Sequence, residues 1–187
     1  MKIIVPCEGK SKRFPEMRPK WMLNHPDGDL MVTKAIKGLN AKPEDIIITI
    51  LKEHEDKYDI ISGLKNNIGD KITIVVLDKQ TNSQPETVYQ TLKSTNLKES
   101  FLIKDSDNVF SFDKVEEEFN YVCYSDIHNY EDINPGNKSY IKLNEQDIIV
   151  DIVEKKIISS LFNVGGYYFK NPEHFKESFE KLSRKNE

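Results

Sequence analysis

Short apolar runs rich in β-branched residues alternate with segments of helical periodicity along roughly the first hundred residues, and this alternation restricts the fold more than any other feature. The sequence predicts strands over residues 2–6, 45–51, 71–77 and 101–104, and helices over residues 30–39, 53–66 and 85–97. Strands separated by helices pair in parallel, because the helix returns the chain to the same end of the sheet. We therefore expect a mostly parallel sheet flanked by helices.

The pattern changes after Asp107. Short strand-like runs occupy residues 121–124, 139–143, 148–153 and 161–169, and a polar connection at residues 144–147 indicates a hairpin. A final helix is predicted over residues 172–182. Because hairpins join antiparallel strands, the fold class we expect is α/β, with a mixed, mostly parallel, Rossmann-like sheet and a more antiparallel second half.

Length and composition narrow the class of protein. The 187 residues have room for one domain, and the net charge of −4 disfavours a general nucleic-acid binder. No apolar run approaches the roughly 18 residues that cross a membrane, and the start of the chain lacks a secretory signal pattern. We therefore expect a cytoplasmic protein with no nucleic-acid partner and no membrane insertion, whose oligomeric state stays open.

A cluster of cations follows the first predicted strand. The cluster has five cations within eleven residues, and two of them are among the three arginines of the chain. Its members are Lys10, Lys12, Arg13, Arg18 and Lys20. The planar guanidinium of arginine matches phosphate geometry, so the cluster indicates an anion site. The alternative is a solvated basic loop. The loop has neither the P-loop pattern nor the dinucleotide pattern Gly-x-Gly-x-x-Gly, which excludes those two kinds of phosphate site.

An acidic cluster, Asp105-Ser106-Asp107-Asn108, follows the fourth predicted strand. The carboxyl ends of parallel strands meet at one edge of a sheet, which is where open α/β sheets bind ligands. We therefore expect the basic loop and the acidic cluster to lie together at that edge. Mg²⁺ takes one or two carboxylates together with phosphate oxygens, so this combination suits a metal–polyphosphate site. The alternative is a solvated turn.

Five motifs occur in the order that is typical of one enzyme family. They are Pro6-Cys7-Glu8-Gly9-Lys10-Ser11-Lys12-Arg13-Phe14 with Arg18-Pro19-Lys20, residues 81–87, residues 105–108, Glu154-Lys155-Lys156, and Asn163-Val164-Gly165-Gly166-Tyr167. In this order they resemble the sugar-phosphate nucleotidyltransferases, which have a GT-A-like fold. The resemblance runs from residue 2 to about residue 170. It looks closest to members from capsule and surface-polysaccharide pathways, such as the cytidylyltransferase that acts on phosphoglutamine.

The resemblance implies an enzyme that transfers a nucleoside monophosphate from a nucleoside triphosphate, with CTP as a candidate, to a phosphorylated acceptor such as a sugar phosphate. Pyrophosphate leaves, and the product would serve capsule or surface-polysaccharide synthesis. The implied roles are catalysis for Arg13 and Lys20, nucleotide binding for Cys7, Gly9, Ser11 and Gln84, Mg²⁺ (or Mn²⁺) binding for Asp107 and Asp105, and acceptor binding for Glu154, Lys155, Asn163 and Gly165.

The sequence departs from the family pattern at three places. Glu8 stands where relatives have a small residue, Ser11 stands where they have a second glycine, and no aspartate follows Phe169. Many relatives supply a second metal carboxylate in that last region, so we expect either a simpler metal site or a chain trimmed at its C-terminus. We expect a single domain over residues 1–187, with a nucleotide-binding half up to about residue 110 and an acceptor-binding half after it.

Two other functions remain open from the sequence. A glycosyltransferase that uses a nucleotide sugar would have a similar sheet and an Asp-x-Asp metal site, but it would release no pyrophosphate. A non-catalytic module that binds nucleotide or sugar phosphate would account for Glu8 and Ser11. The Arg13 and Lys20 loop favours the nucleotidyltransferase, because that loop suits a triphosphate.

Overall fold

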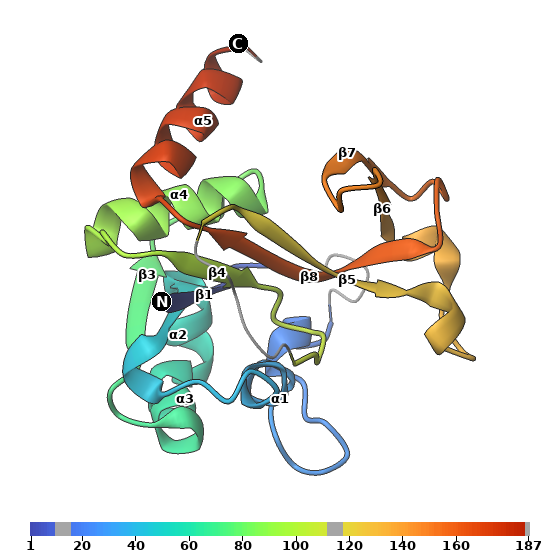
Figure 1. Ribbon diagram of the computed structural model, residues 1–187. Helices are drawn as coiled ribbons and strands as arrows, with labels where there is room; N and C mark the ends of the chain where they lie inside the picture. The colour runs from blue at the N-terminus through green and yellow to red at the C-terminus, as the bar shows by residue number, and fades with distance from the viewer. Residues whose placement is uncertain (10–15, 112–117, 186–187) are drawn as a thin grey trace.

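The computed structural model describes residues 1–9, 16–111 and 118–185 (Figure 1). Over these residues the chain forms one eight-stranded mixed sheet with helices packed against it. The strands are β1 (Lys2–Cys7), β2 (Ile46–Leu51), β3 (Thr73–Leu77), β4 (Phe101–Lys104), β5 (Tyr121–Asp126), β6 (Ser139–Leu143), β7 (Ile149–Glu154) and β8 (Leu161–Phe169). The helices are α1 (Met31–Lys37), α2 (Lys52–Tyr58), α3 (Ile60–Ile68), α4 (Gln84–Thr95) and α5 (Pro172–Lys185).

The first half of the sheet is parallel, as the sequence predicts. Strand β1 pairs in parallel with β2 and β4, and β2 pairs in parallel with β3. Alternate residues of β1 enter two separate cores: Ile3 and Val5 pack with residues of α1 and α3, whereas Ile4 packs with residues of α4 and with Phe175 of α5. Because both faces of β1 and β2 are covered, these strands are continuous apolar runs.

Local signals explain where α4 begins. Ser83 precedes the helix with an extended backbone, and its hydroxyl accepts a hydrogen bond from the backbone N–H of Glu86. Pro85 lies in the first turn, where its missing N–H removes no helical hydrogen bond. The helix therefore begins at the carboxyl edge of the sheet, close to the end of β4.

The single helix predicted over residues 53–66 was wrong, because the structure divides it into α2 and α3. Asp59 separates them in the left-handed conformation, with φ of +47°. The Glu55 side chain then accepts a hydrogen bond from the backbone N–H of Ile61 in the first turn of α3. Aspartate adopts this conformation more readily than most residues. The apolar spacing continues across the break, so periodicity alone did not reveal it.

The second half of the chain is antiparallel, which confirms the expected fold class. Strand β8 runs antiparallel to β4 and β5, and the β6–β7 hairpin joins the sheet where Tyr140 pairs with Phe162 of β8. In Figure 1 this hairpin lies at the end of β8 that is remote from α5. Helix α5 packs on α4, with the Tyr89 and Phe179 rings 4.8 Å apart.

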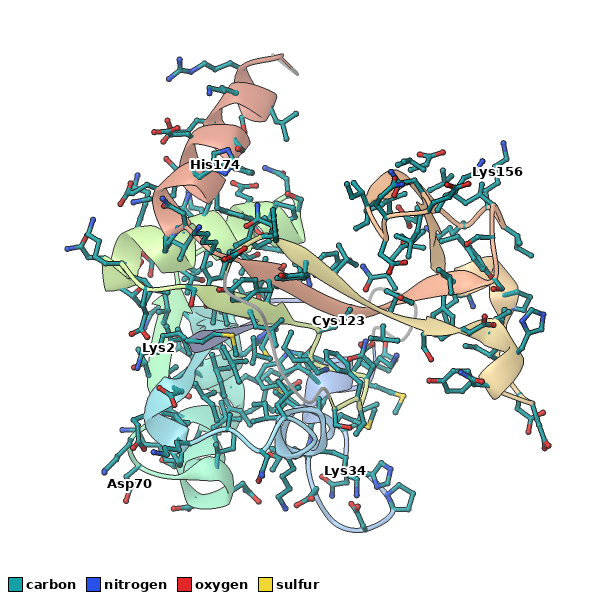
Figure 2. All side chains as sticks on the ribbon, viewed as in Figure 1. Lys2, Lys34, Asp70, Cys123, Lys156 and His174 are labelled. Atoms are coloured by element: carbon teal, nitrogen blue, oxygen red, sulfur yellow. The ribbon has the colours of Figure 1, made fainter. Side chains whose placement is uncertain are left out.

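The side chains in Figure 2 show how the surface and the interior divide. Asp70, Lys156 and His174 lie at the periphery, whereas Cys123 lies on β5 in the middle of the molecule. Cys7 is buried and Cys123 is partly buried, and both are free thiols. None of the helices in the described part of the chain is both long and apolar enough to cross a membrane.

Candidate active site

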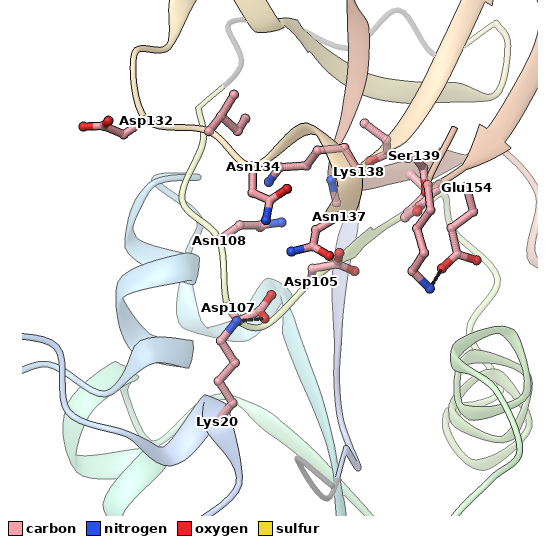
Figure 3. Close-up of a pocket in the computed structure, with 15 residues that line it drawn as sticks. Lys20, Asp105, Asp107, Asn108, Asp132, Asn134, Asn137, Lys138, Ser139 and Glu154 are labelled. Atoms are coloured by element: carbon pink, nitrogen blue, oxygen red, sulfur yellow. Dashed lines mark hydrogen bonds and ion pairs between the residues drawn. The ribbon is translucent and has the colours of Figure 1, made fainter. Parts of the chain in front are cut away.

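Lys20, at the end of the basic segment, meets the acidic cluster at the carboxyl edge of the sheet. The Lys20 ammonium donates a hydrogen bond to Asp107 Oδ2 at 2.7 Å, although the two residues are 87 positions apart in the sequence (Figure 3). Lys20 begins a short 3-10 helix, Lys20–Met22, which is anchored by the buried side chains of Trp21 and Met22. Asp107 belongs to the turn that directly follows β4. The fold thus holds the cation and the carboxylate from two separate elements.

Asp105 is tied to both halves of the chain. Its carboxylate accepts a hydrogen bond from Gln84 Nε2 at 2.7 Å, at the start of α4, and its backbone N–H donates to the Gly165 carbonyl of β8 at 2.8 Å. Burial raises the pKa of Asp105, the Gln84 amide opposes that shift, and the nearby Asp107 carboxylate adds to it. Two carboxylates that repel each other at one site attract a cation.

Gly165 allows β8 to approach the acidic cluster closely. Its φ is +82°, and a Cβ at this position would overlap the Asp105 carboxylate and the Asn108 amide. The backbone N–H of Gly165 donates to Asn163 Oδ1 at 2.5 Å. Asn163 is 9% exposed, and its Nδ2 has no hydrogen-bond partner in the part of the chain that the structure describes. Glycine is required here by both conformation and space.

These groups line a cavity of about 920 Å³ between the two halves of the chain. Seven of the predicted site residues line it: Lys20, Asp105, Asp107, Glu154, Lys155, Asn163 and Gly165. Figure 3 shows Asp105 and Asp107 between Lys20 on one side and Asn134, Asn137 and Lys138 on the other. The cavity is open and lined mainly by polar and charged side chains, as a site for a charged, hydrophilic ligand requires.

Three of the predicted nucleotide-binding residues, Cys7, Gly9 and Gln84, do not line this cavity. Gln84 reaches it only through its hydrogen bond to Asp105. Among the described residues, no atom would lie within 4 Å of a Cβ added to Gly9. Cys7 is fully buried and burial raises the pKa of its thiol, so its side chain cannot meet a ligand as a thiolate. Arg13 and Ser11 lie outside the described residues.

Glu8, the unexpected acid in the basic loop, contacts α4. Its carboxylate accepts a hydrogen bond from the Thr87 hydroxyl at 3.0 Å. Thr87 is fully buried and lies one turn after Gln84 in α4. The negative charge is therefore fixed beside the first turns of α4, where helix N–H groups favour an anion.

On the side of the cavity formed by the second half of the chain, Glu154 and Lys155 form an exposed ion pair at 2.5 Å where β7 ends. Sequence reasoning missed six further lining residues, which come from the segment between β5 and β6 and from the first residue of β6: Asp132, Ile133, Asn134, Asn137, Lys138 and Ser139. The sequence analysis assigned no element and no role to this segment, which contains Pro135-Gly136. Its density of amide and charged side chains was the only available signal.

Comparison with known proteins gives a consistent result at the level of the fold. No family model matches the chain, and no curated protein matches its sequence. Among solved structures, the nucleoside-diphosphate-sugar pyrophosphorylase from Vibrio cholerae RC9 is similar, with a TM-score of 0.77 at 18% identity over 97% of this chain and 78% of that one. The chain has the nucleotidyltransferase fold.

Two other nucleotidyltransferase structures agree with this result. The inositol-1-phosphate CTP transferase from T. maritima matches with a TM-score of 0.69 at 19% identity, over 90% of this chain and 70% of that one. A UDP-glucose pyrophosphorylase complexed with UDP-glucose matches with a TM-score of 0.65 at 19% identity, over 94% of this chain and 77% of that one. At these identities the similarity shows the fold, and the chemistry has to be argued from the site.

The described residues of this site provide too few ligands to hold a divalent metal by themselves, and a substrate would have to supply the others. Across residues 1–9, 16–111 and 118–185, no group of three or more His, Cys, Asp or Glu side chains is arranged to hold a metal. The described donors are the Asp105 and Asp107 carboxylates, which influence each other electrostatically. Mg²⁺ commonly takes one or two protein carboxylates and completes its shell with water and phosphate oxygens. The donor set therefore fits Mg²⁺ bound together with a polyphosphate.

Proposed function

We propose that the chain is a metal-dependent nucleotidyltransferase that moves a nucleoside monophosphate from a nucleoside triphosphate to a small phosphorylated acceptor and releases pyrophosphate. The observation that carries the proposal is the contact between Lys20 and Asp107 at 2.7 Å, inside a polar cavity at the carboxyl edge of the sheet. An exposed cation beside a carboxylate pair provides for both the phosphate and the metal that such a reaction needs.

The chemistry requires charge compensation more than proton transfer. The attacking phosphate is ionised at neutral pH, so the obstacle is repulsion between two anions, and the residues that matter are those that bind and orient them. Lys20 would lie between the nucleotide and acceptor phosphates, and Arg13 would hold the triphosphate. Each fixed cation of this kind contributes about 2–4 kcal/mol, by analogy with an oxyanion donor.

Asp107 and Asp105 are the residues that would hold Mg²⁺ in this proposal. When bound, Mg²⁺ would neutralise the phosphate charge and orient the α-phosphate. The Gln84 amide, which donates to Asp105 at 2.7 Å, supports the ionised form of that carboxylate against the effect of burial. The contact from Lys20 involves Asp107 Oδ2, and within the described part of the chain no hydrogen bond is recorded to Asp107 Oδ1.

We assign the nucleotide to the half of the chain up to about residue 110 and the acceptor to the half after it. Gly9 and Gln84 would contact the nucleotide, with CTP as the first candidate. Glu154, Lys155 and Asn163 would contact the acceptor, for which a sugar phosphate of a capsule or surface-polysaccharide pathway in the cytoplasm is the first candidate. The cavity volume of about 920 Å³ is large enough for a sugar phosphate beside a triphosphate tail.

A matrix of substrates tests the proposal. Four nucleoside triphosphates are each combined with a panel of phosphorylated acceptors in the presence of Mg²⁺, and pyrophosphate release is measured. At least one pair should release pyrophosphate at a rate that depends on both substrates. Binding of nucleotide by calorimetry with no turnover over the whole panel would instead indicate a binding module. Consumption of a nucleotide sugar without pyrophosphate would indicate a glycosyltransferase.

A further inference from the structure

Lys104 is a lysine with no exposed surface, at the point where β4 ends and the acidic cluster begins. It is the last residue of β4, and it pairs with Gly166 of β8. A buried ammonium loses its hydration, so it persists only where protein groups replace the lost water. Neither the sequence motifs nor the comparisons assign this residue a role.

The turn after β4 supplies those groups. The Lys104 ammonium donates to the Asp105 carbonyl at 2.6 Å, to the Asn108 carbonyl at 2.7 Å and to Asn108 Oδ1. A lysine ammonium has three N–H donors, and all three have acceptors here. The Phe110 ring lies 4.8 Å from the same nitrogen. The segment from Asp105 to Asn108 thus folds back around a single cation.

The carboxylates of the site belong to this same segment. Asp105 and Asp107 both interact electrostatically with the Lys104 ammonium, and they favour its charged form against the effect of burial. Asp107 is also held from the solvent side by Lys20 at 2.7 Å. The acidic cluster is therefore fixed by two cations, one buried beneath it and one exposed above it.

We propose that Lys104 is a positioning residue whose buried ammonium fixes the turn from Asp105 to Asn108, and thereby holds the two carboxylates ready for a metal-bound phosphate. Its effect on the reaction rests on the proposed function, whereas its effect on the turn does not. The whole side chain is buried, and its ammonium makes the contacts to the turn. A methionine would preserve the aliphatic part and leave three oxygen acceptors without donors.

A double-mutant cycle measures whether Lys104 acts through the acidic cluster. Lys104→Met should lower kcat about 100-fold with the nucleotide KM changed less than about threefold, a pattern that indicates a loss confined to the transition state. Adding Lys104→Met to Asp107→Ala should lower kcat by about tenfold or less, because the lysine can then act only through the Asp105 carboxylate that remains. Effects that multiply would overturn the proposal.

Hydrogen exchange supplies a second readout that needs no substrate. In Lys104→Met the backbone amides of residues 105–108 should exchange at least about tenfold faster, whereas those of α4 should keep the parent rate. Leu64→Ala, a buried change in α3 remote from the site, is the control for general destabilisation and should leave the exchange of residues 105–108 unchanged. Parent-like exchange of this segment in Lys104→Met would contradict the proposal.

The two readouts separate the possible failures. If no substrate pair releases pyrophosphate in the parent protein, the proposed function fails, and exchange in the turn still decides the role of Lys104. Lys104→Gln is the second variant, since it retains a polar group of similar length. If neither variant folds, Lys104 is a structural residue of the sheet and its positioning role is refuted.

Discussion

Replacement of Gly165 by alanine tests the geometry of the site most directly. Its φ of +82° is a conformation that costs a residue with a Cβ roughly 1 kcal/mol. The added Cβ would also lie 2.7 Å from the Asp105 carboxyl carbon, and overpacking of this kind typically costs about 1–3 kcal/mol. The sum is about 3 kcal/mol, which leaves a protein of ordinary stability folded.

Thermal unfolding measures the energetic part of this prediction. For a chain of this size each kcal/mol lowers Tm by about 2–4 °C, so Gly165→Ala should lower it by about 10 °C. Gly28→Ala is a matched control, because Gly28 has φ of +94° and an added Cβ there would have no atom within 4 Å. That variant carries only the conformational cost and should lose about 3 °C.

Pyrophosphate release measures the functional part. The Cβ of Gly165→Ala would displace the Asp105 carboxylate, so kcat should fall about 100-fold, whereas Gly28→Ala should keep parent activity. Equal Tm values for the two variants would show that Gly165 has free space around it. In that case the close approach of β8 to Asp105, and with it the arrangement of the site, would be refuted.

Three further outcomes are expected. Lys20→Ala should lower kcat/KM about 100-fold while Tm changes by about 2 °C or less, because its side chain is 55% exposed; unchanged kinetics would refute its role. The Thr91 hydroxyl donates to the Thr87 carbonyl at 2.7 Å, so in its 2.6 Å contact with Thr49 it must be the acceptor. Thr91→Val removes both hydrogen bonds and should lower the free energy of unfolding in urea by about 2 kcal/mol, whereas Thr49→Val removes one and should lower it by about 1 kcal/mol. A larger loss for Thr49→Val would contradict this assignment of donor and acceptor. Excess EDTA should stop pyrophosphate release and added Mg²⁺ should restore it, whereas full activity in EDTA would exclude a metal requirement.

The parallel half of the fold could be predicted from the sequence, because strands that are buried on both faces have mostly apolar sequences. A strand such as β2 is fully buried along its whole length, and its sequence is apolar except for Thr49. The convergence of Lys20 and Asp107 followed from that prediction, since both come after strands at the same edge of the sheet. Topology, rather than any single motif, predicted this convergence.

The side of the cavity that residues 132–139 form could not be predicted in the same way. Its residues 132–139 lie mostly in an irregular segment with short 3-10 turns, where side-chain direction follows no period. The break between α2 and α3 at Asp59 could not be predicted for a related reason. A single residue in the left-handed conformation leaves the apolar spacing unchanged on both sides. Patterns predict regular elements, whereas these features depend on the conformation of one residue or on contacts remote in the sequence.

Lys104 shows why a buried cation is hard to recognise in a sequence. A lysine at the end of an apolar run usually marks the point where a strand reaches solvent, and the acids that follow it support that interpretation. The structure contradicts that interpretation. The turn after β4 folds back, and two of its backbone carbonyls accept hydrogen bonds from the Lys104 ammonium. The distinguishing fact is that β8 covers β4 up to its last residue, where Lys104 pairs with Gly166. That pairing joins residues 62 positions apart in the sequence. The burial of Lys104 can therefore be recognised only from the three-dimensional structure.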